Sequence, residues 1–416
     1  MKMRALILAM LLMLFCMGCA RADQTVTLTF TGDCTLGSEE YLRSRETSFD
    51  SFAYAQGYDY FFKHFKELFE EDDATVINLE CVFSDHRGDE NKTKTYRFRG
   101  PTDFVNIITA YSIEAAVLAN NHINDYSRTG LEDTKATLEA AGVAWARLKQ
   151  IYYVEKGNVR IAVISVDQTT LNTNYQWLNK EITRLKTSGE ANAVVMVYHG
   201  GTEYDPKHNA SQAKFARNWI KLGADLVIMH HPHVVQGIEI SRNRTICYSL
   251  GNFVFGGNSE IRSEPWRGDR MATSLYACVA RAELHFDDSG VYTGQQVFLY
   301  PVFISSDAPH NNYQPYPVSG EDAAAVLEAI QFDTPFALPA FNEETGRVTM
   351  DFLPAEEENP PTATPRPTQR RTTTRKPSAT PAPQKTEPAP EPVPDPKPTA
   401  AETGSPAAPQ EPEPGE

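Results

Sequence analysis

The sequence predicts an α/β fold built on a largely parallel sheet, and three observations support this. Short apolar runs typical of buried strands alternate with amphipathic stretches typical of helices. Several of the apolar runs end in carboxylate, amide or imidazole side chains, which gather at the carboxyl ends of strands in open α/β sheets. The 416 residues, 41% of them hydrophobic, are enough for one large domain rather than two.

The expected elements follow in order along the chain. Strands are predicted at 26–30, 74–79, 115–118, 161–166, 193–198, 226–229 and 245–249. Helices are predicted between them at 60–70, 102–111, 130–141, 175–187 and 211–222. Two further strands, 275–286 and 290–300, follow one another without a helix. The sheet is therefore expected to gain antiparallel strands late.

Residues 1–22 are typical of an export signal. Lys2 and Arg4 precede an apolar run shorter than a membrane span of about 20 residues. Ala20-Arg21-Ala22 fits cleavage to a soluble secreted protein, whereas Cys16-Met17-Gly18-Cys19 resembles a lipoprotein box with Cys19 as the lipidated residue. An uncleaved signal anchor is a third alternative. We expect an exported protein, either a lipoprotein on the outer face of the cell membrane or a secreted one.

The C-terminal part of the chain changes composition abruptly. Residues 355–416 are rich in Pro, Thr and Glu and are predicted to form a disordered tail, because such a segment buries too little apolar surface to offset chain entropy. Residues 306–354 are expected to form a C-terminal extension that packs on the domain.

The formal net charge of the chain is −15. Nucleic-acid backbones are bound through basic surfaces, and no basic patch stands out in the folded part. We therefore expect no nucleic-acid partner.

Two of the six cysteines, Cys16 and Cys19, belong to the leader. The other four lack the C-x-x-C spacing of a cysteine zinc site. Cys34 directly follows Asp33 and Cys81 directly follows Glu80. A disulfide between them and two small buried side chains are both open interpretations.

Candidate metal ligands end five of the apolar runs. They combine carboxylate, amide and imidazole donors: Asp33, Glu80, Asn121, His199, His231 and His233. This mixture suits Mn, Fe or Zn better than Ca, and dinuclear hydrolytic centres use it. His231 and His233 flank Pro232 and are expected to project to the same side of an extended segment.

His122 is a candidate general acid. Asp125, three residues on, could accept a hydrogen bond from the imidazole and fix its tautomer, leaving the other nitrogen for proton transfer. The alternative is an Asn-rich capping turn.

Four further residues are candidates for supporting contacts around the ligands. They are Asn78, Glu203, Ser249 and Asn252. Glu203 is either a partner of His199 or a solvated loop charge, and the segment around Ser249 and Asn252 either faces the site or packs a core.

Six motifs occur in the order seen in CapA-type poly-γ-glutamate capsule proteins, and the chain resembles that family over roughly residues 25–300. The motifs are Gly32-Asp33, Asn78-Leu79-Glu80, Asn120-Asn121-His122 with Asp125, His199-x-Gly with Glu203, His231-Pro232-His233-Val234 with Gln236, and Tyr248-Ser249-Leu250-Gly251-Asn252-Phe253. The resemblance implies a CapA-like domain at residues 24–305.

The CapA-type family in turn resembles the calcineurin-like metallophosphoesterases. This implies an α/β/β/α sandwich with two divalent ions. By motif, Asp33 and His233 would bind the first ion, Glu80 would bridge, and Asn121, His199 and His231 would hold the second. His122 would be the acid beside the leaving group. Thr35 stands where the phosphoesterase motif has a histidine, which predicts a weakened first position.

Two functions follow from the resemblance. One is a metal-dependent, phosphoesterase-like hydrolase with an anionic capsule polymer or a phosphoester as substrate, involved in synthesis, export or anchoring of a polymer such as poly-γ-glutamate. The other is a non-catalytic surface or assembly component that works with capsule synthesis proteins and keeps a degenerate metal site. Attachment to the membrane would be through the lipid or signal anchor.

Overall fold

A computed structural model describes residues 24–261 and 273–352. The predicted signal segment with Cys19 and the predicted disordered tail both lie outside these residues. None of the helices within the described ranges has the length and apolarity that a membrane-spanning helix requires.

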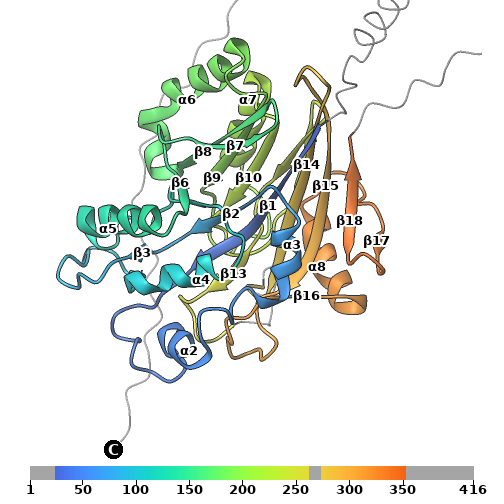
Figure 1. Ribbon diagram of the computed structural model, residues 1–416. Coiled ribbons are helices and arrows are strands. Elements are labelled where there is room, and N and C mark those ends of the chain that lie inside the picture. Colours follow the sequence, from blue (N-terminus) through green and yellow to red (C-terminus); the bar gives the residue numbers. More distant parts are fainter. Residues whose placement is uncertain (1–23, 262–272, 353–416) are drawn as a thin grey trace, which may run out of the picture. The chain divides into compact units, whose positions relative to one another are not determined.

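The larger sheet has ten strands (Figure 1). Its order is β17 (Phe341–Asn342), β18 (Arg347–Asp351), β15 (Tyr292–Phe303), β14 (Tyr276–Phe286), β1 (Gln24–Thr35), β2 (Ala74–Leu79), β5 (Ala115–Val117) and β6 (Ala144–Ala146). β13 (Asn252–Phe255) also pairs with β1, and β16 (Tyr316–Pro317) with β15. The strands β1, β2, β5, β6 and β13 are parallel, whereas β14 and β15 run antiparallel, as predicted for the late strands.

The smaller sheet has six strands. Its order is β11 (Ile238–Ser241), β12 (Arg244–Cys247), β10 (Leu226–His230), β9 (Ala193–His199), β8 (Val159–Asp167) and β7 (Tyr152–Lys156). The strands β8, β9, β10 and β12 are parallel. A short third pair joins β3 (Val82–Phe83) to β4 (Arg99–Gly100).

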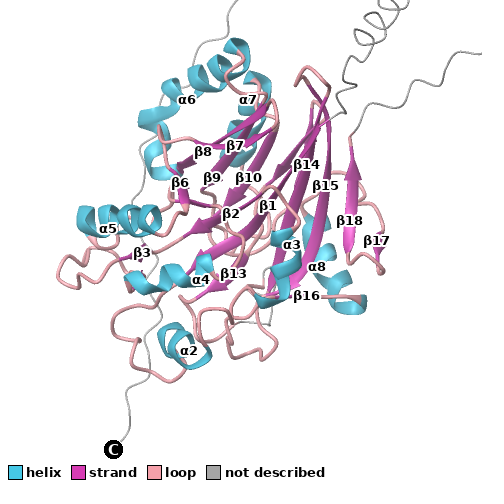
Figure 2. Cartoon of the chain, viewed as in Figure 1, coloured by secondary structure: helices cyan, strands magenta, loops and turns pink. Residues whose placement is uncertain are grey.

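Helices cover the outer face of each sheet (Figure 2). Beside the larger sheet lie α2 (Phe49–Gln56), η1 (Lys63–Phe65), α3 (Lys66–Glu70), η2 (Thr102–Phe104), α4 (Val105–Thr109) and α5 (Ser127–Ala140). Beside the smaller sheet lie α6 (Gln168–Ser188) and α7 (Ala210–Leu222). α7 begins at a capping box formed by Asn209 and Gln212 and ends at Gly223 in a left-handed conformation.

Successive side chains along a strand point to opposite faces of its sheet, and this alternation divides the core into layers. In β8, Ile161 and Val163 enter the core between the two sheets, while Ala162 and Ile164 enter the core beneath α6 and α7. The same alternation in β2 places Val76 between the sheets and Ile77 beneath the helices. The predicted metallophosphoesterase-like α/β/β/α order is therefore confirmed.

Several elements differ from the sequence prediction. α6 begins at Gln168, seven residues before the predicted start at Tyr175, because Asp167 caps it by accepting hydrogen bonds from the amides of Thr169 and Thr170. The helices α2 and α8 (Gly320–Phe332) and the short strands β6 and β7 were not predicted. α8 buries Ala323, Val326 and Ile330 in the core between the sheets.

Candidate metal centre

The centre lies where strand ends of the two sheets meet. In the larger sheet, Asp33 of β1 is in register with Asn78 of β2 and Asn252 of β13. In the smaller sheet, His199 of β9 is in register with His230 of β10. These strands are parallel, so their carboxyl ends point to one edge, as the sequence predicted.

A close backbone approach holds Asp33 in place. The amide of Asp33 donates to the carbonyl of Gly251 at 2.9 Å. A Cβ atom on the preceding Gly32 would lie 2.3 Å from that same oxygen. Only glycine fits at position 32, because any side chain would push the two strands apart. The hydroxyl of Ser249 accepts from the amide of Gly251, so Ser249 shapes this turn.

Glu80 is the central residue of the site. Its side chain is completely buried, and neither carboxylate oxygen has a hydrogen-bond partner among the described residues. Three imidazoles surround it: Nε2 of His199, His233 and His122 lie 3.3, 3.9 and 4.0 Å from Oε1. A buried carboxylate without donors is costly. A cation bound between it and the imidazoles would remove that cost, so the residues present fit a metal.

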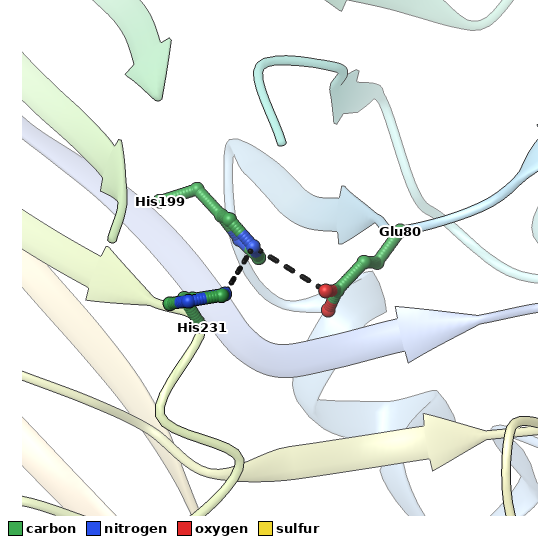
Figure 3. A group of neighbouring side chains, drawn as sticks. All are labelled: Glu80, His199 and His231. Atoms are coloured by element: carbon green, nitrogen blue, oxygen red, sulfur yellow. Dashed lines mark hydrogen bonds and ion pairs between the residues drawn. The ribbon is translucent and has the colours of Figure 1, made fainter. Parts of the chain in front are cut away.

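Two ligand groups share Glu80. One consists of Glu80, His199 and His231, shown in Figure 3. The other consists of Asp33, Glu80 and His233. We call them the second and the first position, following the order that the family resemblance implies. Asn121 extends the second position, because its Oδ1 lies 2.7 Å from Nε2 of His199.

Amide side chains orient the ligands from behind. Asn78 donates to Oδ1 of Asp33 at 2.8 Å and also contacts Nδ1 of His199 at 3.2 Å. Oδ1 of Asn252 lies 2.9 Å from Nδ1 of His233, which leaves Nε2 of that imidazole facing Glu80. Such outer contacts fix the tautomer and the ring orientation of a ligand.

The segment that carries His231 and His233 is not extended, contrary to the sequence prediction. Both residues have positive φ, 98° and 58°, which is uncommon for side-chain-bearing residues. The chain turns directly after β10, and the amide of His231 then donates to Oδ2 of Asp33 at 3.2 Å. The two rings still lie close together, 5.9 Å apart. Strained backbone of this kind clusters at functional sites.

His122 and Asp125 form a pair beside the centre. Nδ1 of His122 lies 2.7 Å from Oδ2 of Asp125, which leaves Nε2 directed toward Glu80. Asp125 is also held by the ammonium of Lys94 and by the amide of Phe98, which donates to Oδ2 at 2.7 Å. This fixed carboxylate orients the imidazole, as the general-acid hypothesis requires.

Protonation differs sharply between the imidazoles. Burial lowers the pKa of His199 to about 3 and, together with the neighbouring His199 and His233, lowers that of His231 to about 2. Burial also opposes the charged form of His233, but the Glu80 charge and a hydrogen bond to Asp33 outweigh it and raise the pKa to about 10.

The two carboxyl groups also differ. Burial and the charge of Asp33 raise the pKa of Glu80 to about 8. Burial acts the same way on Asp33, but hydrogen bonds from His230 and His233 outweigh it and hold the pKa of Asp33 well below its ordinary value. Asp33 is therefore ionised over the whole physiological range.

Glu203 lies at the mouth of the centre. Its side chain is half-exposed, and Oε1 lies 4.0 Å from Nε2 of His231. With His231 and His233 it forms a third group of donor atoms that could hold a metal ion. The structure thus places Glu203 beside His231 rather than His199, the partner that the sequence suggested.

The sequence matches the profile of the bacterial capsule synthesis protein family PGA_cap over residues 27–257, more than half of the chain. The chain belongs to this family. The match ends before β14, so α8 and the antiparallel strands β14 and β15 lie outside it.

Three relatives of this PGA_cap chain illustrate the similarity. Capsule biosynthesis protein CapA of Bacillus anthracis is 29% identical over 259 residues, covering 56% of this chain and 61% of that protein. PGA biosynthesis protein CapA of Bacillus subtilis strain 168 is 26% identical over 255 residues, covering 56% and 64%. A probable polyglutamine synthesis accessory protein of Mycobacterium tuberculosis is 26% identical over 227 residues, covering 46% and 59%. The chain spans about three fifths of the length of these relatives.

This PGA_cap chain departs from the phosphoesterase pattern at Thr35. The Thr35 side chain is buried, and its hydroxyl donates to the backbone carbonyl of Glu80 at 3.3 Å. The Thr35 hydroxyl therefore supports the backbone at Glu80, and Thr35 does not supply the imidazole that the phosphoesterase pattern has at this position.

Sequence reasoning missed three contacts in the PGA_cap site. Nδ1 of His230 lies 3.1 Å from Oδ1 of Asp33, and the run His230-His231-Pro232-His233 was the signal that could have found it. Lys94 contacts Asp125, and Gln168 lies 3.1 Å from Nε2 of His231. The last two residues belong to no motif, so nothing in the sequence pointed to them.

The cysteine alternatives are resolved in favour of buried side chains. Cys34 and Cys81 are both buried and free, so the disulfide is not present. Burial raises the pKa of the Cys34 thiol to about 12, which keeps it protonated and unreactive.

Proposed function

We propose that this chain is a metal-dependent hydrolase of the cell envelope that acts on an anionic capsule polymer of the poly-γ-glutamate type or on a phosphoester used in making it. Membership of the PGA_cap family supports the link to capsule synthesis. The polymer follows from the names of its relatives, which refer to PGA and polyglutamine. Export as a lipoprotein or a secreted protein remains part of this proposal.

One observation carries the hydrolase assignment: Glu80 is completely buried with both carboxylate oxygens lacking hydrogen bonds, and it is shared by two groups of metal-binding side chains. The residues that would hold two ions are Asp33, Glu80 and His233 on one side, and Glu80, Asn121, His199 and His231 on the other. Mixed nitrogen and oxygen donors favour Mn, Fe or Zn. Such ions would supply Lewis acidity at the scissile bond.

The protein's own groups would complete the reaction. Asp125 accepts from Nδ1 of His122 and fixes the tautomer in which Nε2 faces Glu80. With a proton on Nε2, His122 would protonate the departing oxygen or nitrogen. The amide of Phe98 and the ammonium of Lys94 hold Asp125 against rotation, so His122 keeps its direction.

The test compares His122→Asn with the wild-type chain. Both purified proteins are loaded with Mn, Fe or Zn, their metal content is measured, and turnover of aryl phosphoesters and γ-glutamyl peptides is followed. We expect unchanged metal content and a turnover reduced by roughly 10²–10⁴-fold, the usual contribution of a general acid. Wild-type chain that binds metal and cleaves neither class would contradict the hydrolase.

Thr35 favours a second candidate, a non-catalytic component of the capsule machinery with one weakened metal position. Capsule formation in cells that carry His122→Asn distinguishes the two. Normal capsule supports the assembly role, whereas loss of capsule together with loss of turnover supports the enzyme.

A further inference from the structure

A cavity lies at the edge of the smaller sheet opposite the metal centre. Its volume is about 510 Å³. It is open to solvent and is lined by the last turns of α6 and α7, the residue before β10, the β11–β12 hairpin and the β14–β15 hairpin. The metal centre follows the carboxyl ends of β9 and β10, whereas this cavity borders their amino ends. A ligand bound here would therefore be separate from the metal centre.

The cavity wall carries more positive than negative charge. Lys186, Arg242 and Arg244 line it together with a single carboxylate, Asp225. The guanidinium of Arg244 lies over the ring of Tyr292, 4.0 Å from its centroid. This stacking holds Arg244 flat against the wall.

Asp225 is already fully engaged. Its Oδ1 lies 3.1 Å from Nε of Arg244, and its Oδ2 lies 3.0 Å from the ammonium of Lys186. Oδ2 also accepts from the amide of Val194 at 3.0 Å. Asp225 is almost completely buried, so its charge is directed into the wall and does not face a ligand.

Two nearby carboxylates are also engaged elsewhere. Oδ1 of Asp287 accepts from the amides of Ser289 and Val291 within its own turn, at 2.8 and 2.9 Å. Glu190 pairs with Arg184 and accepts from the hydroxyl of Tyr153. Neither carboxylate pairs with Arg242.

Arg242 is the free cation of the cavity. Its side chain is exposed and makes no hydrogen bond or ion pair with any described residue. Arg242 and Asn243 have φ of 52° and 57°, the signature of a hairpin turn that favours Asn or Gly at both positions. An arginine is costly in this conformation, and its side chain gains no bond to a described residue in return. A cation therefore stands at a position where the turn alone would favour Asn or Gly.

We propose that this cavity binds the carboxylates of a glutamyl chain. Arg242 would pair with one carboxylate, and Arg244, held in place on the ring of Tyr292, would form the positively charged wall beside it. The choice of a glutamyl chain rests on the proposed function. Because the cavity lies apart from the metal centre, it would hold a polymer without exposing that segment to cleavage.

The experiment measures binding of a γ-linked glutamate pentapeptide to the full, metal-free chain by calorimetry in chelator and low salt. The test variant is Arg242→Asn, which removes the charge and supplies a residue that the turn prefers. The matched control is Arg45→Asn, the same change at an exposed position with no side-chain bond to a described residue. We expect the test variant to bind about tenfold more weakly, as for loss of one charge-assisted contact, and the control to bind like wild type.

Three results would overturn the proposal. They are no binding of the pentapeptide to the wild-type chain, equal binding by Arg242→Asn, and displacement of the pentapeptide by an equal concentration of inorganic phosphate, which would mark a phosphate site instead. The measurement excludes metal, so it does not depend on hydrolysis. Arg242-dependent binding in a chain that cleaves nothing would support the cavity while contradicting the hydrolase.

Discussion

The two positions of the candidate metal centre have opposite electrostatics, although the histidines that distinguish them are two residues apart. His231 faces another imidazole, His199, at 3.1 Å, and its pKa is lowered to about 2. His233 faces the carboxylate of Asp33 at 3.4 Å, and its pKa is raised to about 10. The second position therefore presents neutral imidazoles ready to bind an ion, whereas the first position holds a proton that an ion must displace. Burial disfavours the charged form of both rings, so the difference comes from the groups beside them: the imidazole of His199 beside His231, and the carboxylates of Glu80 and Asp33 beside His233.

The largest expected effect is at the residue that both positions share. Glu80→Gln removes the charge that both positions share. Loss of a residue that only supports a ligand weakens metal binding by up to about 100-fold, so we expect loss of this direct ligand to weaken binding of both ions by at least that much. The metal-free variant is not expected to melt earlier, because glutamine avoids burying a charge. Metal analysis and calorimetric titration measure both effects. Glu132→Gln, an exposed change on α5, is the control, and full metal content in Glu80→Gln would refute the site.

Removal of either histidine separates the two positions. His231→Ala leaves Asp33, Glu80 and His233, while His233→Ala leaves Glu80, His199, His231 and Asn121. Each variant is expected to bind one ion, and His233→Ala is expected to bind it about 10–100-fold more tightly because it keeps more donors. Titration with Mn²⁺ followed by electron paramagnetic resonance gives the stoichiometry and affinity. Equal affinities in the two variants would remove the distinction between the positions.

The sequence predicted much of this centre, because strand ends in parallel sheets converge and because the ligand types are distinctive. Asp33, Glu80, Asn121, His199, His231 and His233 all lie together as expected. The opposite protonation of the two histidines was not predictable, since it depends on which charged or neutral group the fold places beside each ring: His199, 32 positions before His231, and Glu80 and Asp33, 153 and 200 positions before His233. Lys94 was missed because it belongs to no motif, although it lies only 31 positions before Asp125.

The sequence predicted some elements of the fold and missed others. The four parallel strands of the smaller sheet, β8, β9, β10 and β12, were found because their apolar runs are bounded by turns, whereas the edge strands β7 and β11 were missed. The division into two facing sheets came from the family resemblance, not from periodicity, because a buried strand has the same pattern in either sheet. α8 was missed, although its alanine-rich inner face fills the core between the sheets.

The metal affinity of the two positions should depend on pH to different extents. Ions need deprotonated ligands, and both positions share Glu80, whose pKa is raised to about 8. Only the first position must also remove a proton from His233, which holds it up to about pH 10. As pH rises from 7 to 9, we expect affinity at the first position to rise about tenfold per unit more than at the second. Calorimetry of His231→Ala and His233→Ala in buffers of different ionisation enthalpy counts the released protons, and identical slopes would contradict the assignment.

The smallest expected effect is an increase in metal affinity at the first position when Thr35 is replaced in Thr35→His. The imidazole would restore the donor that the phosphoesterase pattern has there, so the first ion should bind more tightly. We expect a gain in affinity of about tenfold, the lower value found when a residue that supports a metal ligand is lost. Thr35 is completely buried, so the larger side chain is expected to cost about 1–3 kcal/mol of stability in the metal-free chain. Thr35→Val, which keeps the shape and loses the hydroxyl bond to Glu80, is the matched control and should not tighten binding. If Thr35→His destabilises the chain and the first ion binds no more tightly, then the weakness of the first position arises from the proton on His233, not from the missing ligand.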